Sequence, residues 1–245
     1  SQEEAFWHQG HGTVFEGADG SWWTIFHGRN KDFTEMGRPA LLMPIEWTND
    51  GWPIQKKGVQ TDDLIPKPKG ENSGHGLALS DDFETTEPGI QWYYDNAKKT
   101  NFKFGNKQLK MKASGDTYKT ASEIYSYAPN TSFEVVVKVS GATKKAISGL
   151  RLGNEGIATD GATVFFGEGP DWRTKQSIYT LKNKNTVWLK IKNNQKDLSM
   201  FYSEDGTNWT KFDCSVRAHD SYKYSLFSYG TGEVLFETFR YQGLE

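Results

Sequence analysis

The chain has 245 residues and a formal net charge of −2 at pH 7, so it can form one large or two modest domains and has no basic excess to attract nucleic acid. Its 25 glycines and an aromatic content of 14%, within a hydrophobic content of 36%, favour β structure over helix bundles. No apolar segment approaches the length of a membrane span, and the single cysteine, Cys214, excludes an internal disulfide.

Residues 10–54 predict an antiparallel meander with short strands at 13–15, 22–27 and 41–45. Asp19-Gly20 lies between two apolar segments, and Asp50-Gly51 follows the third. An Asp-Gly pair in such a position is a strong hairpin signal, because glycine adopts positive φ at no steric cost.

Residues 55–79 differ in character from the segments on either side. Prolines alternate with lysines at 66–69, glycine is frequent and hydrophobic periodicity is lost. This composition predicts an extended linker or crossover and marks a domain boundary.

Residues 80–245 predict a series of short strands with one apolar face. Apolar side chains alternate with polar ones at 133–139 and at 187–191, among other places, and turn signals recur roughly every ten residues. This pattern indicates a β-sandwich or jelly roll of about eleven strands. The predicted fold class is therefore all-β, with no amphipathic helix.

The order of motifs in the meander resembles a known family. His11-Gly12 precedes a strand, Asp-Gly-x-Trp-Trp follows at 19–23, Gly-Arg at 37–38, and Trp-x-x-Asp-Gly-Trp-Pro at 47–53. This order resembles the end of the five-bladed β-propeller of glycoside hydrolase family 43, which holds β-xylosidases, α-L-arabinofuranosidases and arabinan-degrading enzymes. The resemblance implies that residues 1–54 are a partial propeller blade.

The second part of the chain has a resemblance of its own, over residues 80–245. It opens with Asp81-Asp82-Phe83 and a Gln-Trp strand at 91–92, continues with Tyr-Ser-Glu-Asp-Gly-Thr-Asn-Trp at 202–209, and ends with an aromatic strand at 236–241. That order is similar to the concanavalin A-like antiparallel β-sandwich attached behind many family 43 propellers. The resemblance implies an accessory sandwich domain, with the linker at 55–79 before it.

The resemblance also implies where the catalytic residues are. Inverting hydrolysis of a glycosidic bond needs a carboxylic acid and a carboxylate base with a water between them. In the family these are an Asp base and a Glu acid, helped by a second Asp, and all three come from earlier blades. Only nine residues precede Gly10, and five blades need roughly a hundred residues in strands alone.

We therefore expect no catalytic residue in this chain and at most one blade. The missing propeller portion is expected on another chain, or to have been lost by truncation or proteolysis. The alternative is that the meander packs onto the sandwich as an extra layer.

Two residues of the meander match pocket residues of the family. His11 corresponds to a histidine beside a central metal ion, often calcium, which it contacts mainly through water; its plain alternative is a turn histidine without a ligand. Arg38 corresponds to an arginine that hydrogen-bonds sugar hydroxyls, for which its five donors are suited. The alternative for Arg38 is a loop salt bridge with Glu35 or Asp32.

The sandwich offers further candidates for sugar contacts. The resemblance implies that one of its loops adds an aromatic residue to the sugar pocket, and Tyr222 and Tyr224, before the strand at Leu226, are the nearest candidates. Trp172 is predicted to lie in an exposed loop, where its ring either binds a carbohydrate or anchors the loop. Alternating strand positions favour a core role for four tryptophans of the meander: Trp22, Trp23, Trp47 and Trp52.

Three functions remain open at this point. The first is the C-terminal portion of a family 43-like enzyme that hydrolyses xylan, arabinan or arabinoxylan with inversion when complete, and is inert as this chain alone. The second is a carbohydrate-binding sandwich, and the third is a module that braces the propeller. Neither nucleic acid nor a membrane is expected as a partner. We expect a secreted or periplasmic location. Residues 1–10 do not resemble a signal peptide, so either the signal peptide has been removed or this start is not the natural one.

Overall fold

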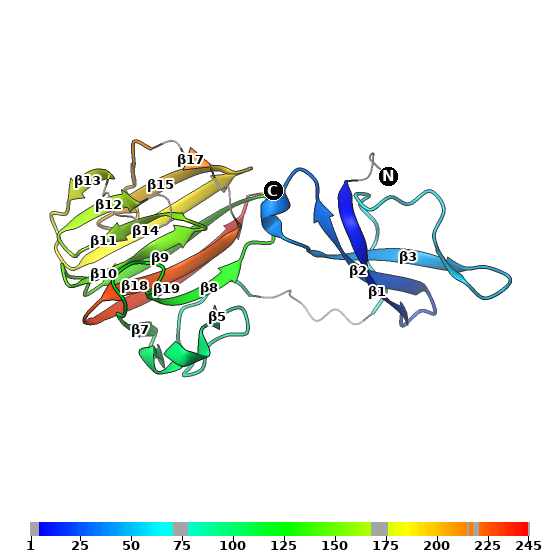
Figure 1. Ribbon diagram of the computed structural model, residues 1–245, viewed down its shortest axis with the longest axis horizontal. Helices are drawn as coiled ribbons and strands as arrows, with labels where there is room; N and C mark the ends of the chain where they lie inside the picture. The colour runs from blue at the N-terminus through cyan, green and yellow to red at the C-terminus, as the bar shows by residue number, and fades with distance from the viewer. Residues whose placement is uncertain (1–4, 71–77, 168–175, 215, 218–220, 245) are drawn as a thin grey trace. The chain divides into compact units, whose positions relative to one another are not determined.

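The computed structural model describes residues 5–70, 78–167, 176–214, 216–217 and 221–244. The chain divides into two compact units, unit 1 (Ser1–Gly76) and unit 2 (Leu77–Glu245), both drawn in Figure 1. The helices in the described residues are two short 3-10 turns, η1 (Thr34–Met36) and η2 (Asn96–Asn101), and the remaining regular elements are strands. The predicted all-β class is confirmed. None of the helices in the described ranges has the length and apolarity to cross a membrane.

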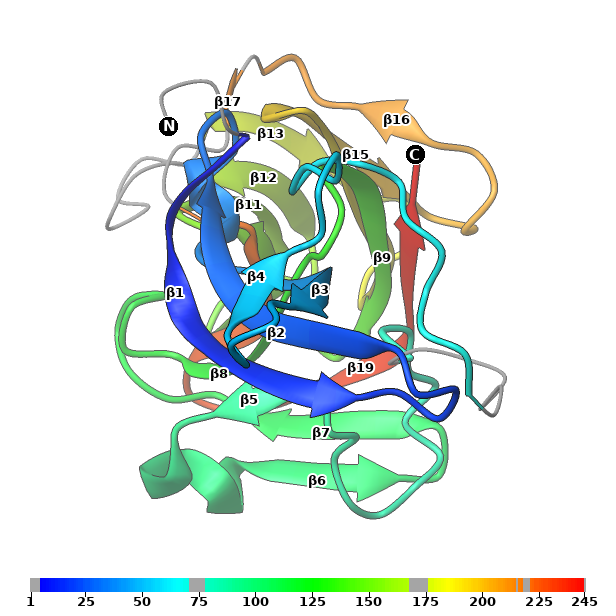
Figure 2. The same cartoon turned by 90° about the vertical axis from the view of Figure 1, so that its right-hand side faces the viewer.

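Unit 1 is one antiparallel sheet of four strands in the order β1-β2-β3-β4. The strands are β1 (Phe6–Glu16), β2 (Trp22–Asn30), β3 (Ala40–Trp47) and β4 (Pro53–Gln55). Figure 2 shows β1 and β2 curving side by side. The glycines of the two predicted turns, Gly20 and Gly51, have φ of 78° and 84°, values that other residues rarely adopt. Four strands are the size of one propeller blade.

The residues after β4 turn back over this sheet. The backbone N–H of Lys56 donates to the carbonyl oxygen of Pro44 at 3.2 Å, and Val59 and Ile65 are partly buried. The first part of the predicted linker therefore packs against the sheet. The boundary between the two compact units falls later, at Gly76.

Unit 2 is a sandwich of two antiparallel sheets (Figure 1). One sheet has seven strands: β13 (Gln176–Thr180), β12 (Thr163–Gly167), β11 (Glu155–Thr159), β10 (Ala146–Leu152), β18 (Lys223–Gly230), β8 (Ser122–Tyr127) and β5 (Tyr93–Tyr94). The other has β16 (Thr210–Lys211), β15 (Asp197–Ser203), β14 (Thr186–Asn194), β9 (Ser132–Ser140), β19 (Glu233–Gly243), β7 (Gln108–Lys112) and β6 (Phe102–Gly105), with β17 (Val216–Arg217) paired to β15.

The core of unit 2 lies between these sheets and follows the predicted alternation. On β9, Phe133, Val135 and Val137 are fully buried, as are Leu189 and Ile191 on the neighbouring β14. The described part of unit 2 has fifteen strands, β5 to β19, rather than about eleven. Three of the fifteen, β5, β16 and β17, are only two residues long and have too few residues to show a period.

Candidate functional site

The first two strands of unit 1 bring two histidines together. The pairing is regular from the turn outward to Thr13, which faces Ile25, and then shifts so that Gly10 faces His27. His11 lies within this irregular stretch with a φ of 53°, in the left-handed region. Its ring centroid is 6.3 Å from that of His27. A β-bulge of this kind changes the direction of a side chain relative to the sheet.

Arg38 joins these histidines from the segment before β3. It follows η1 and Gly37, whose φ is 76°, and it precedes Ala40, which pairs with His27 on β2. Nη1 of Arg38 is 3.3 Å from Nε2 of His27. Arginine can only donate, so Nε2 of His27 is the acceptor and carries no proton while this bond exists.

His11, His27 and Arg38 form what we call the donor cluster. Arg38 is exposed and His27 is half-buried, so the guanidinium contacts His27 through one nitrogen while the Arg38 side chain stays accessible to solvent. The contact that the structure gives Arg38 is with His27, rather than the alternative salt bridge with Asp32 or Glu35. Such a cluster can bind ligand oxygens by hydrogen bonds.

His27 was not among the residues predicted from the sequence. The nearest signal for it was the hairpin: continuing the register in which Thr13 faces Ile25, without a shift, places His11 opposite His27. The bulge shifts the pairing by one residue and keeps the two rings near each other.

The donor cluster does not by itself fit a calcium ion. Calcium prefers six to eight oxygen ligands. Within the described ranges, no three His, Cys, Asp or Glu side chains gather closely enough to hold a metal. The metal contact expected for His11 therefore requires ligands from outside these residues and stays a prediction.

Tyr222 and Tyr224 are not on a sugar-facing loop, and that expectation is corrected. Both side chains are 0% exposed. The Tyr222 hydroxyl donates to the carbonyl oxygen of Thr131 at 3.4 Å, and the Tyr224 ring stacks on Phe239 at 5.5 Å. Burial raises the pKa of Tyr224 to about 12. The strand expected at Leu226 begins three residues earlier, at Lys223, so its alternation turns Tyr224 inward, and Tyr222, directly before the strand, is buried as well.

Trp172, the other aromatic candidate of the sandwich, lies outside the described residues.

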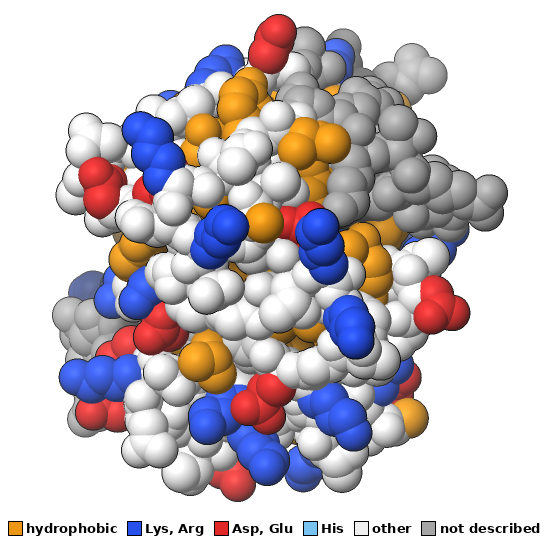
Figure 3. Space-filling model, turned by 90° about the vertical axis from the view of Figure 1, so that its left-hand side faces the viewer, with side chains coloured by type: hydrophobic (Ala, Val, Ile, Leu, Met, Phe, Trp, Pro, Cys, Tyr) orange, Lys and Arg blue, Asp and Glu red, His pale blue; other side chains and the backbone are white. Residues whose placement is uncertain are grey.

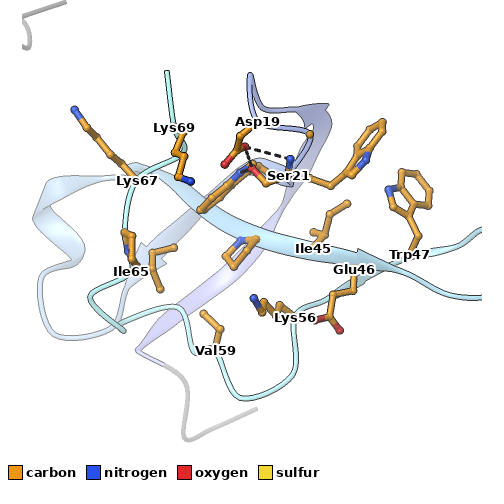
Figure 4. Close-up of a pocket in the computed structure, with 15 residues that line it drawn as sticks. Asp19, Ser21, Ile45, Glu46, Trp47, Lys56, Val59, Ile65, Lys67 and Lys69 are labelled. Atoms are coloured by element: carbon orange, nitrogen blue, oxygen red, sulfur yellow. Dashed lines mark hydrogen bonds between the residues drawn. The ribbon is translucent and has the colours of Figure 1, made fainter. Parts of the chain in front are cut away.

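A pocket of about 620 Å³ lies at the other end of the unit 1 sheet, beside the Asp19-Gly20 turn (Figure 4). Trp23 and Pro44 contribute to its lining, and the returning segment contributes Val59 and Ile65. This pocket does not include the donor cluster.

The tryptophans of unit 1 divide between core and surface. Trp23 is 7% exposed and donates from Nε1 to Oγ of Ser21 at 2.7 Å, as expected of a core residue. Trp22 and Trp47 meet edge to face with ring centroids 5.0 Å apart. Trp47 and Trp52, both expected in the core, are 43% and 68% exposed instead, and Trp52 lies in the turn before β4.

Two carboxyl groups, Asp19 and Glu46, line this pocket, but their arrangement does not suit glycoside hydrolysis. Hydrogen bonds from the hydroxyl and backbone N–H of Ser21 hold the pKa of Asp19 below its usual range. A general acid for this reaction needs a raised pKa instead. Figure 4 shows Glu46 at the opposite edge of the pocket from Asp19, near Lys56.

Comparison with known proteins finds similarity to one family model in unit 1. Residues 1–53 match the model of Glycosyl hydrolases family 43. A curated relative, the non-reducing end alpha-L-arabinofuranosidase BoGH43B of Bacteroides ovatus, is 29% identical over 89 residues, which are 35% of this chain and 17% of that protein. The family resemblance seen in the sequence is confirmed.

Solved structures match both units. A mutant of the GH43 protein BlXynB from Bacillus licheniformis has a TM-score of 0.83 at 17% identity. The match covers 99% of this chain and 55% of the BlXynB chain. Bacteroides ovatus Xyloglucan PUL GH43B has a TM-score of 0.81 at 17% identity, with the same coverage. Xylan beta-1,4-xylosidase from Bacillus halodurans has a TM-score of 0.72 at 15% identity, covering 98% of this chain and 54% of its own. These matches show the fold, and this chain spans about half the length of each of the three proteins.

Proposed function

We propose, on the premise that residues 1–53 are glycoside hydrolase family 43 sequence, that this chain is the C-terminal portion of a glycosidase of that family. The complete enzyme would hydrolyse xylose- or arabinose-containing plant polysaccharide such as xylan, arabinan or arabinoxylan. The names of two similar proteins, an arabinofuranosidase and a xylan xylosidase, support this substrate class. Because the aligned residues cover 17% of the curated relative, and the chain spans about half the length of the similar solved structures, the activity is assigned to the longer protein.

The observation that carries the proposal is the donor cluster of His11, His27 and Arg38. Arginine presents five donors in a rigid fork, which suits two neighbouring hydroxyls of a sugar. His27 accepts one of these donors and so fixes the direction of the guanidinium. In this proposal Arg38 binds substrate, His27 positions Arg38, and His11 lies beside the metal of the complete propeller.

The acid and base of the reaction are proposed to lie on the missing propeller portion. Inversion requires two carboxyl groups roughly 6.5–9.5 Å apart, with space for the attacking water. The donor cluster supplies hydrogen-bond donors but no carboxyl group. The chain then contributes binding and orientation to the reaction, while proton transfer takes place elsewhere.

Exposed apolar side chains on the unit 1 sheet support a missing neighbour. Val14 and Ile54, which line the same groove, are 37% and 40% exposed, and Ile25, on the opposite face, is 44% exposed. One groove of about 370 Å³ is lined by Val14 together with Phe26 and Met43. Contiguous exposed apolar surface of this kind marks an interaction site, and the missing propeller portion is the partner we assign to it.

Calcium and location remain part of the proposal. Calcium would be held by oxygen ligands of the missing portion, because the described residues do not provide them. A plant polysaccharide is too large to enter a cell intact, so a secreted or periplasmic location fits this substrate.

The test is an activity assay with and without the protein encoded upstream of Ser1. The purified chain should not hydrolyse a chromogenic β-xyloside or α-L-arabinofuranoside, and addition of the upstream portion should restore turnover. In the restored enzyme, Arg38→Lys should raise KM about tenfold or more, because one ammonium cannot replace the guanidinium fork. Arg29→Lys, an exposed arginine at the end of β2, is the control and should leave KM unchanged.

Two results would contradict the proposal. Turnover by the chain alone would show that its own carboxyl groups suffice. Equal KM values for Arg38→Lys and Arg29→Lys would remove the substrate role of Arg38.

A further inference from the structure

Three tyrosines stand together on the outer face of the seven-stranded sheet. Tyr93 on β5 pairs with Tyr125 on β8, and Tyr127 lies two residues further along β8 on the same face. Ile124 and Ser126, which flank Tyr125 on β8 and face the opposite way, are buried in the sandwich at 0% and 3% exposed. Tyr93 and Tyr127 are 53% and 52% exposed. We call Tyr93, Tyr125 and Tyr127 the tyrosine platform.

The rings of the tyrosine platform are held in place by one another. Tyr93 and Tyr125 stack with centroids 5.6 Å apart and planes 20° apart, and Tyr127 meets Tyr93 edge to face at 6.2 Å. Nζ of Lys223 lies 3.9 Å from the centroid of the Tyr125 ring and 3.0 Å from Oε1 of Glu123. Contacts from strands on both sides fix the platform, so a ligand would meet a surface that is already ordered.

Elsewhere, the outer face of this sheet is covered by side chains from the segment before β8. A cross-strand row runs through Glu123, Phe227, Gly149, Ala158 and Phe165. Tyr118 and Ala121, from the segment before β8, pack on Phe227, Ala158 and Phe165, all of which are at most 3% exposed. The cover leaves Tyr93 and Tyr127 open, although large aromatic side chains are usually covered where the fold can do so.

The phenol hydroxyls of the tyrosine platform are also available to a ligand. The hydroxyls of its three tyrosines form no hydrogen bond with any residue in the described part of the chain. The nearby cations, Lys223 and Arg151, both pair with Glu123, so no excess of positive charge favours a polyanion. Figure 3 shows cations and acids interspersed at one end of the sandwich. The platform therefore offers ring faces and neutral donors and acceptors.

We propose that the tyrosine platform binds a neutral plant oligosaccharide, with sugar rings lying on Tyr93 and Tyr127. A pyranose ring has an apolar face of C–H groups and an edge of hydroxyls, which complement an aromatic face with a phenol hydroxyl beside it. The choice of xylan- or arabinan-type chains rests on the proposed function, whereas the stacking chemistry does not. This site is made entirely of unit 2 residues and serves to hold polysaccharide.

The experiment is affinity electrophoresis of the 245-residue chain in gels that contain xylan or arabinan, followed by calorimetric titration with xylohexaose or arabinohexaose. We expect retardation in at least one gel. Tyr93→Ala/Tyr127→Ala should raise the dissociation constant about tenfold or more, since each ring supplies its own stacking contact. Tyr93→Phe/Tyr127→Phe, which keeps the rings, should retain most of the binding.

The control is Ile178→Ala, which removes another exposed apolar side chain from β13 of the same sheet and should bind like the unaltered chain. Circular dichroism and the melting temperature confirm that each variant is folded. No retardation of the unaltered chain in either gel, or equal binding by the double alanine variant, would overturn the inference. These results are independent of the proposed function, because turnover with the upstream portion is measured separately and does not require the platform.

Discussion

Glu123 lies between two cations on the outer face of the sandwich. Its Oε1 is 2.5 Å from Nη2 of Arg151 and 3.0 Å from Nζ of Lys223, and the side chain is only 19% exposed. Burial raises the pKa of Glu123, but the charges of Arg151 and Lys223 outweigh it and hold the pKa below its usual value of 4.5. The carboxylate thus stabilises the fold only while it is ionised.

We expect Glu123→Gln to destabilise unit 2 by roughly 2 kcal/mol at pH 7, because it leaves two cations without their counter-charge. A depressed pKa in the folded state gives stability that is present above the unfolded pKa and is lost as pH falls through the folded pKa. The difference between the variant and the unaltered chain should therefore shrink as the pH falls below 4.5. Urea unfolding at pH 7 and pH 3 measures it.

Asp197→Asn is the control for Glu123→Gln. Asp197 pairs with Arg217, but these side chains are 72% and 59% exposed, and such surface pairs contribute little. Equal unfolding midpoints for the two variants at pH 7 would contradict the role given to Glu123.

Strands β10 and β11 approach each other closely at Gly149. A Cβ at this position would lie 2.2 Å from the backbone oxygen of Ile157 and 2.8 Å from Cα of Ala158. Because these are backbone atoms, the clash cannot be relieved by turning a side chain. The absence of a side chain at Gly149 is thus a condition for this strand pairing.

Gly149→Ala should lower the free energy of unfolding of unit 2 by about 2 kcal/mol, the cost of forcing packed elements apart. Thermal unfolding monitored by circular dichroism measures the change. Gly10→Ala is the matched strand glycine, since a Cβ there would meet nothing within 4 Å, and it should leave that transition in place. An unchanged melting temperature for Gly149→Ala would show that the strands can separate at little cost.

The whole molecule combines a well-buried sandwich with a single four-stranded sheet that leaves apolar side chains exposed. In unit 2 the aromatic and aliphatic side chains of both sheets meet in one core, whereas in unit 1 only Trp23, Met43 and Ile45 are buried hydrophobic residues among those described. An isolated sheet of this size has edges and faces that attract partners. The proposed partner is the rest of a propeller.

Val14→Lys should prevent the upstream portion from binding, because it places a charge in the groove that Val14 lines with Phe26 and Met43. Ile178→Lys, an equally drastic change on the sandwich surface, should not affect that binding. Co-purification with a tagged upstream portion measures both. Normal capture of Val14→Lys would show that this face of the sheet is not the contact surface.

Local patterns in the sequence predicted the turns and most of the longer strands, but not the shortest strands or the full extent of β1. Alternation at Val135, Val137 and Leu189 predicted the buried faces of β9 and β14, and Asp-Gly pairs predicted turns at Gly20 and Gly51. These features depend on the period of the strand and on the conformational freedom of glycine, both of which are set by neighbouring residues. The family match also depends on short motifs that the first 53 residues contain.

Contacts between distant residues were decided only by the tertiary structure. The pairing of β1 with β2 brings His27 to His11 and Arg38, the alternation of β18 buries Tyr224, and β5 aligns Tyr93 with Tyr125. The sequence by itself determined where most of the longer strands form, because that depends on local chemistry. Which faces meet, and which side chains stay exposed, depended on register and on the partners of each strand, because a shift of one residue in pairing reverses the face of every side chain.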